Sequence, residues 1–360
     1  MTTAKKIRIG LAGCGGRGRG MLSIMLKGFP EHIVLAAVSD PSVEASAQAQ
    51  AQYPECKIFS DADVMIRESD IDVAVITTPA NDHARYAVSA LKKKIHVFSD
   101  IPCVFNLQEA DELWETAQKS SALYMTGANP NMWAFIRYAK EITAQGLIGK
   151  PYYAEAEYIH DIRDLFLKTP WRTQFPHIQY CTHSLGPVLD VINELPVRVS
   201  CFGTGDHFCP ETRTHNAIAA LFRTAGGTVI RVLVSFSNEC PSGGHRYRIY
   251  GTEGYFERTP EYSGHGSAKT LLYSKKFRTD KAFTEVPVHE MREEFSGKNA
   301  AGHGGADYAM IDAMIKAVNG TDDYPIDLKK GLAMTIPGIY AAQSACNDGN
   351  PEDISYPWTS

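Results

Sequence analysis

Residues 6–12 read KIRIGLA and run directly into Gly13-Cys14-Gly15-Gly16-Arg17-Gly18. The first segment is a short apolar run rich in isoleucine and leucine, which predicts a buried strand. Apolar residues then recur at helical spacing, so the G-x-G-x-x-G pattern lies between a strand and a helix. This context favours a dinucleotide-binding turn over the alternative, an ordinary glycine-rich turn.

Each position of this pattern has a physical reason. Gly13 permits the tight turn, Gly15 lets the backbone approach a pyrophosphate, and Gly18 lets helix and strand pack closely. The backbone N–H groups at the start of the helix, around Gly16 and Arg17, would face the phosphates.

A second apolar run, residues 33–38, ends at Ser39-Asp40. Asp40 follows Gly18 by about 20 residues, where a carboxylate binds the ribose hydroxyl groups of the cofactor. The same carboxylate would repel a 2′-phosphate. The sequence therefore favours NAD over NADP.

Apolar strands continue to alternate with helical patterns as far as residue 125. Strands at 73–76, 96–98 and 123–125, separated by helices, predict a doubly wound parallel sheet. Ligands bind beyond the carboxyl ends of such strands. The further cofactor candidates at this edge are Thr78, Pro79, His83, Asp100, Pro102 and Asn129.

The pattern changes near residue 131, which predicts an α/β chain of two domains. Residues 1–130 would form the Rossmann domain, and 131–360 a substrate-binding and oligomerisation domain. A large, open, mostly antiparallel sheet with helices on one face is expected in the second. Its runs lie at 152–159, 197–202, 217–222, 228–236 and 246–250. We expect its open face to form a homo-oligomer, and the last helix, 328–347, to pack back on the first domain.

Composition excludes several classes of partner. The net charge is −5 and the pI about 6.2, which argues against nucleic acid. No apolar run reaches the roughly 18 residues that span a bilayer, so no membrane partner is expected. The start of the chain has no signal-peptide pattern, and the eight cysteines are scattered without a C-x-x-C pair. These features predict a cytoplasmic protein with buried, reduced cysteines.

Three histidine motifs lie at element boundaries in the second half: Tyr158-Ile159-His160-Asp161-Ile162-Arg163, Tyr180-Cys181-Thr182-His183-Ser184-Leu185-Gly186-Pro187, and Gly302-His303-Gly304-Gly305-Ala306-Asp307. His183 is the first catalytic candidate, because imidazole titrates near neutrality and exchanges protons with a hydroxyl group. His160, Asp161 and Tyr158 are further candidates. The alternatives are a buried structural His183, a structural His160–Asp161 ion pair and a helix-capping His303. No spacing supports a metal site.

The order of the motifs resembles the Gfo/Idh/MocA oxidoreductase family over essentially the whole chain. The resemblance rests on Gly13-x-Gly15-x-x-Gly18, Thr78-Pro79-x-x-x-His83, Asp100-x-Pro102 and Trp171-Arg172. It implies an NAD(P)-dependent enzyme that oxidises or reduces a secondary hydroxyl of a sugar or cyclitol. Two positions depart from the family pattern: the E-K-P lysine is Ile101, and the aspartate of D-x-x-x-H is Gln179.

The second-domain motifs are similar to one branch in particular, the NAD-dependent glycosidases of glycoside hydrolase family 109. That resemblance implies oxidation at C3 of a sugar, elimination of the aglycone, addition of water and final reduction. The histidine of the branch's T-H-x-L-G-P motif maps onto His183. Its tyrosine after the last Rossmann strand has no clean match in Asn129-Pro130-Asn131-Met132-Trp133.

The resemblance also implies roles for the remaining candidates. Trp171 and Arg172 would contact the cofactor. The expected substrate contacts are Trp133, Arg163, Gln179, Tyr180 and His303. Three hypotheses stay open: an NAD-dependent dehydrogenase acting at C3 of a sugar or glycoside, a redox-neutral NAD-dependent glycosidase, and a non-catalytic NAD-binding protein.

Overall fold

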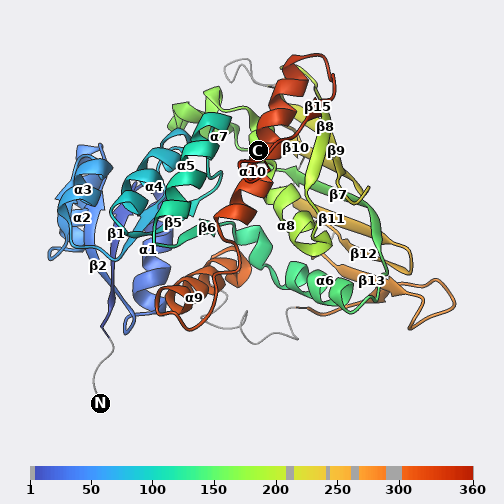
Figure 1. Ribbon diagram of the computed structural model, residues 1–360, viewed down its shortest axis with the longest axis horizontal. Helices are drawn as coiled ribbons and strands as arrows, with labels where there is room; N and C mark the ends of the chain where they lie inside the picture. The colour runs from blue at the N-terminus through green and yellow to red at the C-terminus, as the bar shows by residue number, and fades with distance from the viewer. Residues whose placement is uncertain (1–4, 208–214, 241–243, 261–266, 289–301, 360) are drawn as a thin grey trace. The chain divides into compact units, whose positions relative to one another are not determined.

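The computed structural model describes residues 5–207, 215–240, 244–260, 267–288 and 302–359 (Figure 1). The chain forms two compact units: Met1–Met132 with Glu294–Leu332, and Trp133–Glu293 with Ala333–Ser360. The first change of unit lies close to the predicted boundary at residue 130. The chain later returns to the first unit, and helix α10 (Leu328–Cys346) has its first turn there.

The first unit contains the predicted parallel sheet. Its strands are β1 (Ile7–Ala12), β2 (Ile33–Ser39), β3 (Lys57–Phe59), β4 (Val73–Ile76), β5 (His96–Asp100) and β6 (Tyr124–Gly127). They are arranged in the order β3-β2-β1-β4-β5-β6, and every pairing is parallel. The doubly wound fold is confirmed. The sequence did not predict β3, which is only three residues long.

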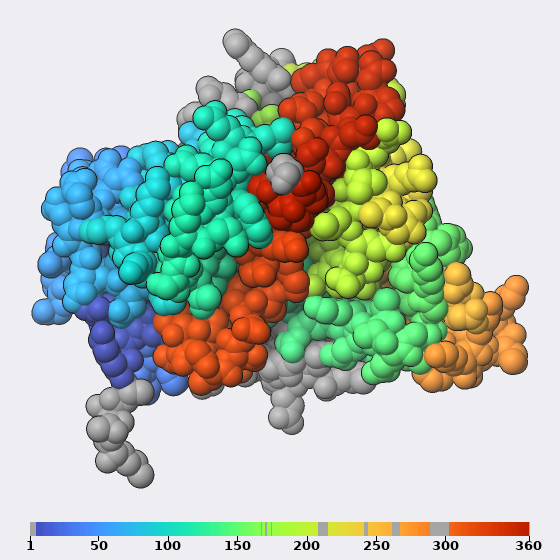
Figure 2. All heavy atoms as spheres, in the orientation of Figure 1, coloured from blue at the N-terminus to red at the C-terminus, as the bar shows by residue number. Residues whose placement is uncertain are grey.

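Helices pack around this sheet: α1 (Gly16–Gly28), α2 (Val43–Gln52), α3 (Ala62–Glu68), α4 (His83–Lys92), α5 (Leu107–Lys119) and α9 (Ala306–Val318). Asn106 caps α5 as predicted, since its side chain accepts a hydrogen bond from the amide of Glu109. Helix α9 comes from the far end of the sequence and packs against α1. Figure 2 shows atoms of α5, in teal, and of α9, in orange, at the surface of this unit.

The second unit is built on a mixed, mostly antiparallel sheet. In the described part of the chain its order is β14-β13-β12-β11-β7-β10-β9-β8-β15. The pairing of β7 with β10 is parallel, and the other pairings are antiparallel. The strands are β7 (Pro151–Ile159), β8 (Pro196–Gly203), β9 (Ala217–Thr224), β10 (Val229–Ser235), β11 (Gly244–Gly251), β12 (Gly254–Arg258), β13 (Thr270–Ser274), β14 (Thr284–Glu285) and β15 (Glu352–Asp353).

One face of this sheet is covered and the other is open. Helix α8 (Thr182–Ile192) packs on β7, β10 and β11, and α6 (Ala134–Ala144) packs on α8 (Figure 1). Strand β9 shows the consequence: Ile218, Ala220 and Phe222 are buried, whereas Ala219 and Leu221 are exposed. This is the alternation expected of a sheet with one solvated face. Among the described helices, none is long and apolar enough to cross a membrane.

Three short helical segments lie between β7 and α8 in the sequence. They are α7 (Arg163–Lys168), η3 (Pro170–Gln174) and η4 (His177–Cys181). In the first unit, η1 (Ala80–Asp82), η2 (Asn129–Met132) and η8 (His303–Gly305) similarly follow or precede regular elements. All the histidine and tryptophan motifs predicted from the sequence lie on or beside these boundaries.

Candidate active site

The turn between β1 and α1 is crowded on one side and open on the other. Gly13 has a φ of +89°, and a Cβ there would lie 2.8 Å from the carbonyl oxygen of Thr77. A Cβ on Gly18 would collide with the carbonyl oxygen of Gly13, so α1 packs this closely only because residue 18 is glycine. A Cβ on Gly15 or Gly16 would meet no atom within 4 Å. The open side adjoins a helix N-terminus, whose N–H groups bind phosphate oxygens.

Asp40 lies beside this turn. One of its carboxylate oxygens accepts a hydrogen bond from the amide of Cys14 at 2.7 Å, and the other from the amide of Ser42 at 2.8 Å. The backbone of the turn therefore orients the carboxylate, which stays partly exposed. This placement fits the predicted binding of ribose hydroxyl groups.

The remaining cofactor candidates of the first unit follow β4, β5 and β6, at one edge of the sheet. His83 connects two of these segments: its Nδ1 lies 2.8 Å from the carbonyl oxygen of Pro102, and its Nε2 lies 2.9 Å from that of Thr78. Asp100 is the last residue of β5, and Asn129 begins η2. The parallel sheet thus brings residues from three crossovers to the edge where ligands bind in this fold.

Arg17 directs its side chain to two carboxylates. Its Nε lies 2.9 Å from Asp100, and its Nη1 lies 2.9 Å from Asp307. Burial opposes the positive charge, but the two carboxylates raise the pKa of the guanidinium. The ion pairs therefore occupy the side chain of Arg17, and its backbone amide in the first turn of α1 is the part suited to face a phosphate.

Asp307 is a functional candidate that the sequence did not single out. It lies in the first turn of α9, is 2% exposed, and accepts hydrogen bonds from His303 Nδ1 at 2.8 Å and Asn129 Nδ2 at 3.4 Å. Burial by itself would raise the pKa of the Asp307 carboxyl. The hydrogen bond from His303 and the positive charge of Arg17 outweigh burial and lower this pKa. The only sequence signal was an acid four residues after His303. The structure places His303, a predicted substrate contact, on this carboxylate.

In the second unit, four rings from four elements form one stack. They belong to Tyr180 in η4, His183 in the first turn of α8, Tyr158 in β7 and His245 in β11. Successive ring centroids are 4.8, 5.1 and 4.1 Å apart, with interplanar angles of 20°, 16° and 18°. His245 and Tyr158 are directly opposite each other in the pairing of β11 with β7. The hydroxyl of Tyr247 donates to the carbonyl oxygen of His183 at 2.6 Å and fixes the start of α8.

His245 was missed because the expected strand began one residue later, at Arg246. Only the pairing of β11 with β7 reveals His245, because it places this histidine opposite Tyr158 on the covered face of the sheet. Trp133, a predicted substrate contact, packs on the same ring, with centroids 4.7 Å apart at 64°. The predicted residues Tyr158, Tyr180, His183 and Trp133 therefore lie in one cluster, in which His245 lies between Tyr158 and Trp133.

The pKa values of Tyr158 and His160 are shifted in opposite directions. The Tyr158 hydroxyl lies 3.0 Å from His160 Nδ1. Burial raises the pKa of Tyr158, and partial desolvation lowers that of His160. At neutral pH the phenol is therefore protonated and donates to a neutral imidazole. A pair of groups displaced in opposite directions is suited to acid and base roles.

Asp161 and Arg163 bind each other. Arg163 Nε and Nη2 lie 2.8 and 2.7 Å from the carboxylate of Asp161, and Nη1 lies 2.8 Å from Glu239. The bond from Arg163 lowers the pKa of Asp161, which stays ionised and is a weak proton acceptor. The structure thus separates the motif into a Tyr158–His160 pair and an ion pair.

Four predicted contacts lie in the segment before α8: Trp171, Arg172, Gln179 and Tyr180. Arg172 places its guanidinium carbon 4.5 Å from the centroid of the Trp171 ring, a cation–π contact. Gln179 is 5% exposed, so it is the least accessible of the predicted substrate contacts.

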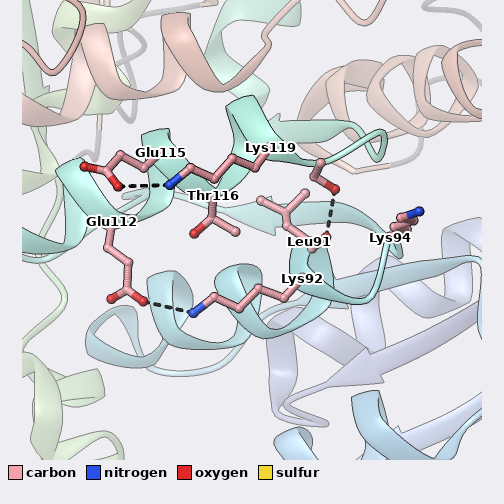
Figure 3. A pocket seen from close by; sticks show the side chains of 8 residues that line it. Leu91, Lys92, Lys94, Glu112, Glu115, Thr116 and Lys119 are labelled. Carbon is pink, nitrogen blue, oxygen red and sulfur yellow. Dashed lines mark hydrogen bonds and ion pairs between the residues drawn. The ribbon is translucent and has the colours of Figure 1, made fainter.

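A surface depression of about 410 Å³ lies elsewhere, between the ends of α4 and α5 (Figure 3). Four of its charged residues form two ion pairs: Lys92 lies 3.3 Å from Glu112, and Lys119 lies 3.4 Å from Glu115. It contains none of the residues predicted to act in binding or catalysis.

Comparisons with known proteins agree with this arrangement. Residues 7–128 match the model of an oxidoreductase family with an NAD-binding Rossmann fold, and residues 136–257 match the GFO/IDH/MocA C-terminal domain. These matches define an NAD-binding oxidoreductase. The chain belongs to the Gfo/Idh/MocA family.

Similar curated proteins span nearly the whole chain. A glycosyl hydrolase family 109 protein of Saccharopolyspora erythraea is 26% identical, and the match covers 97% of this chain and 82% of that protein. An alpha-N-acetylgalactosaminidase of Shewanella oneidensis is 25% identical, with coverages of 98% and 84%. Both matches therefore extend through both domains of this chain.

Solved structures share the fold. Levoglucosan dehydrogenase in complex with NADH and levoglucosan has a TM-score of 0.83 and 18% identity, with coverages of 97% and 100%. An inositol dehydrogenase homolog from Azotobacter vinelandii, complexed with NADH and myo-inositol, has a TM-score of 0.80 and 18% identity, with coverages of 98% and 98%.

The two sides of the glycine turn predict different outcomes for the same substitution. Gly18→Ala should lower the unfolding midpoint, because its Cβ would collide with Gly13. Gly15→Ala should leave that midpoint unchanged, since its Cβ meets open space, but should weaken NAD binding at least about tenfold by obstructing approach to the backbone. Thermal unfolding and fluorescence titration with NAD measure the two effects. Equal NAD affinity in Gly15→Ala and wild type would contradict the cofactor assignment.

Proposed function

We propose that this protein is an NAD-dependent oxidoreductase that acts on a secondary hydroxyl, at C3, of a sugar or glycoside. The observation that carries the proposal is the stack of Tyr180, His183, Tyr158 and His245. It supplies protonatable groups beside aromatic surface, in a chain whose other unit has an NAD-binding Rossmann fold. Levoglucosan and myo-inositol, named with the similar structures, carry several secondary hydroxyls and support this substrate class.

The first unit fits the cofactor. Gly13, Gly15, Gly16, Gly18 and the amide of Arg17 would hold the pyrophosphate. Asp40 would bind the adenosine ribose. Thr78, Pro79, His83, Asp100, Pro102 and Asn129 would shape the nicotinamide end. Trp171 and Arg172 are the further cofactor contacts that the family resemblance implies. When bound, NAD supplies a hydride acceptor.

His183 would remove the proton of the reacting hydroxyl. Its backbone is held by Tyr247, and its ring lies between Tyr158 and Tyr180. Ile101 stands where the family carries a lysine, and an alkyl side chain neither donates a proton nor stabilises an alkoxide. A histidine held in one orientation is a suitable replacement because imidazole exchanges protons near neutral pH.

The substrate contacts that the sequence predicts would include two members of this cluster, Trp133 and Tyr180. Trp133, Trp171 and Tyr180 would offer flat apolar surface to a pyranose ring. Arg163, Gln179 and His303 would hydrogen-bond its hydroxyl groups. Arg163 and His303 are already oriented by Asp161 and Asp307, which favours a fixed geometry over a flexible one.

A second candidate is a redox-neutral glycosidase on the same residues. The glycosyl hydrolase family 109 relatives support it, as does the named alpha-N-acetylgalactosaminidase. Elimination of an aglycone needs a base for the C2 proton and an acid for the leaving group, in addition to His183. Tyr158 and His160, with pKa values displaced in opposite directions, are the groups suited to those steps.

Reduced-nicotinamide absorbance with a panel of glycosides separates the hypotheses. Stoichiometric reduction with a product two hydrogens lighter by mass spectrometry supports the dehydrogenase. Released aglycone without net reduction supports the glycosidase. His183→Ala should lose at least about 100-fold in rate and keep its NAD affinity, whereas His32→Ala, an exposed control, should behave as wild type. Full activity in His183→Ala would remove this histidine from the mechanism, and no turnover with any glycoside would favour a non-catalytic binder.

Cofactor preference tests Asp40 separately. Asp40→Ala should weaken NAD binding and narrow the difference between NAD and NADP, because it removes both the ribose acceptor and the charge that repels a 2′-phosphate. Glu44→Ala changes an exposed carboxylate nearby on α2 and serves as control. An unchanged ratio of the two dissociation constants in Asp40→Ala would show that Asp40 is misassigned.

We also propose that a second copy of this chain binds the open sheet face. Six charged residues on this face pair with one another, three acids with three arginines: Glu155, Glu157, Glu257, Arg231, Arg246 and Arg248. Covering a self-neutralised network leaves no charge without a partner. Leu221 and Val229 add exposed apolar area beside it.

Light scattering measures this association. The wild type should be a dimer or larger, and Leu221→Lys should shift toward the monomer. The reason is that a lysine placed opposite Arg231 adds an uncompensated charge to the contact. Val43→Lys, at an exposed position on α2, is the matched control and should not change the mass. A monomeric wild type at micromolar concentration would overturn the proposal.

A further inference from the structure

His83 is enclosed by the two segments that it connects. His83 is the first residue of α4 and is 2% exposed. Nδ1 lies 2.8 Å from the carbonyl oxygen of Pro102, and Nε2 lies 2.9 Å from the carbonyl oxygen of Thr78. Both distances are those of ordinary hydrogen bonds. Both partners are backbone oxygens, so the two contacts have the same chemistry.

A neutral imidazole cannot satisfy both contacts. It carries one N–H donor and one nitrogen with a lone pair, and a carbonyl oxygen only accepts. One of the two carbonyls would therefore face a lone pair at hydrogen-bond distance. Turning the ring by half a turn would put carbon atoms in place of both nitrogens and leave both oxygens without this donor. An imidazolium donates from both nitrogens.

We propose that His83 is held as an imidazolium in the folded protein and acts as a positioning residue for the cofactor edge. It joins the segment after β4 to the segment after β5 and adds a fixed positive charge there. This inference uses the proposed function only in assigning that edge to the cofactor. The protonation state follows from the hydrogen bonds alone.

The charged side chains at this edge of the sheet form one network. Asp100 and Asp307 contribute two negative charges, and both bind the single guanidinium of Arg17. Pro102, which accepts from His83, lies two residues after Asp100 in the sequence. His303 also binds Asp307, so a second histidine lies in this charged network. Two charge-assisted hydrogen bonds offset the desolvation of a buried cation.

The first test reads the protons directly. Nitrogen-15 NMR of protein labelled at histidine would be recorded at pH 7, with the His83 signals identified by their loss in His83→Gln. We expect one-bond couplings to hydrogen on both ring nitrogens of His83. A signal from one unprotonated ring nitrogen would overturn the imidazolium. This result does not depend on NAD binding or on catalysis.

The second test measures positioning. His83→Gln keeps one donor and removes the charge, so NAD affinity should fall at least about tenfold in a fluorescence titration. His96→Gln is the control: His96 begins the same strand, β5, at the opposite edge, and should not alter NAD affinity. Wild-type affinity in His83→Gln would overturn the positioning role. Failure of the wild type to bind NAD would instead refute the proposed function and leave the NMR result standing.

Discussion

The close approach of α1 to the turn after β1 is the constraint on which the first unit depends. It requires glycine at residue 18, because a side chain would collide with the backbone at Gly13. Once α1 is held there, Arg17 reaches both Asp100 and Asp307 and ties the helix to the end of β5 and to α9. Asp307 in turn orients His303 and Asn129. One steric condition thus fixes a network that includes residues 290 positions apart in the sequence.

The second unit depends on strand register in a comparable way. Pairing of β11 with β7 sets His245 against Tyr158, and α8 adds His183 to the same stack. Burial raises the pKa of Tyr158, and partial desolvation lowers that of His160 at the end of the strand. Packing therefore widens the difference that already exists between the ordinary pKa values of a phenol and an imidazole.

Ile101 stands at the position of the lysine in the family's E-K-P motif, so this position supplies no proton-transfer group. Ile101 is 5% exposed and supplies packing in place of a proton-transfer group. In the function proposed above, proton transfer would fall to the histidine and tyrosine groups of the second unit. Dehydrogenation and redox-neutral glycoside cleavage would draw on the same residues, and they differ in whether elimination follows oxidation. The oxidation step proposed for the cluster is common to both reactions.

The sequence alone determined the parts that depend on local pattern. The glycine turn, Asp40 and the alternation of strands and helices depend on residues close together in sequence, and they predicted the Rossmann fold. The β-rich runs between residues 152 and 250 predicted the mostly antiparallel second sheet. Asp307 and His245 could not be found this way, because their roles arise from contacts with Arg17 and Tyr158, which are distant in sequence. The tertiary structure also revealed the ion pair between Asp161 and Arg163 and the two hydrogen bonds of the His83 ring. Local periodicity encodes the elements, whereas charge partners and proton positions are decided by which elements the tertiary fold brings together.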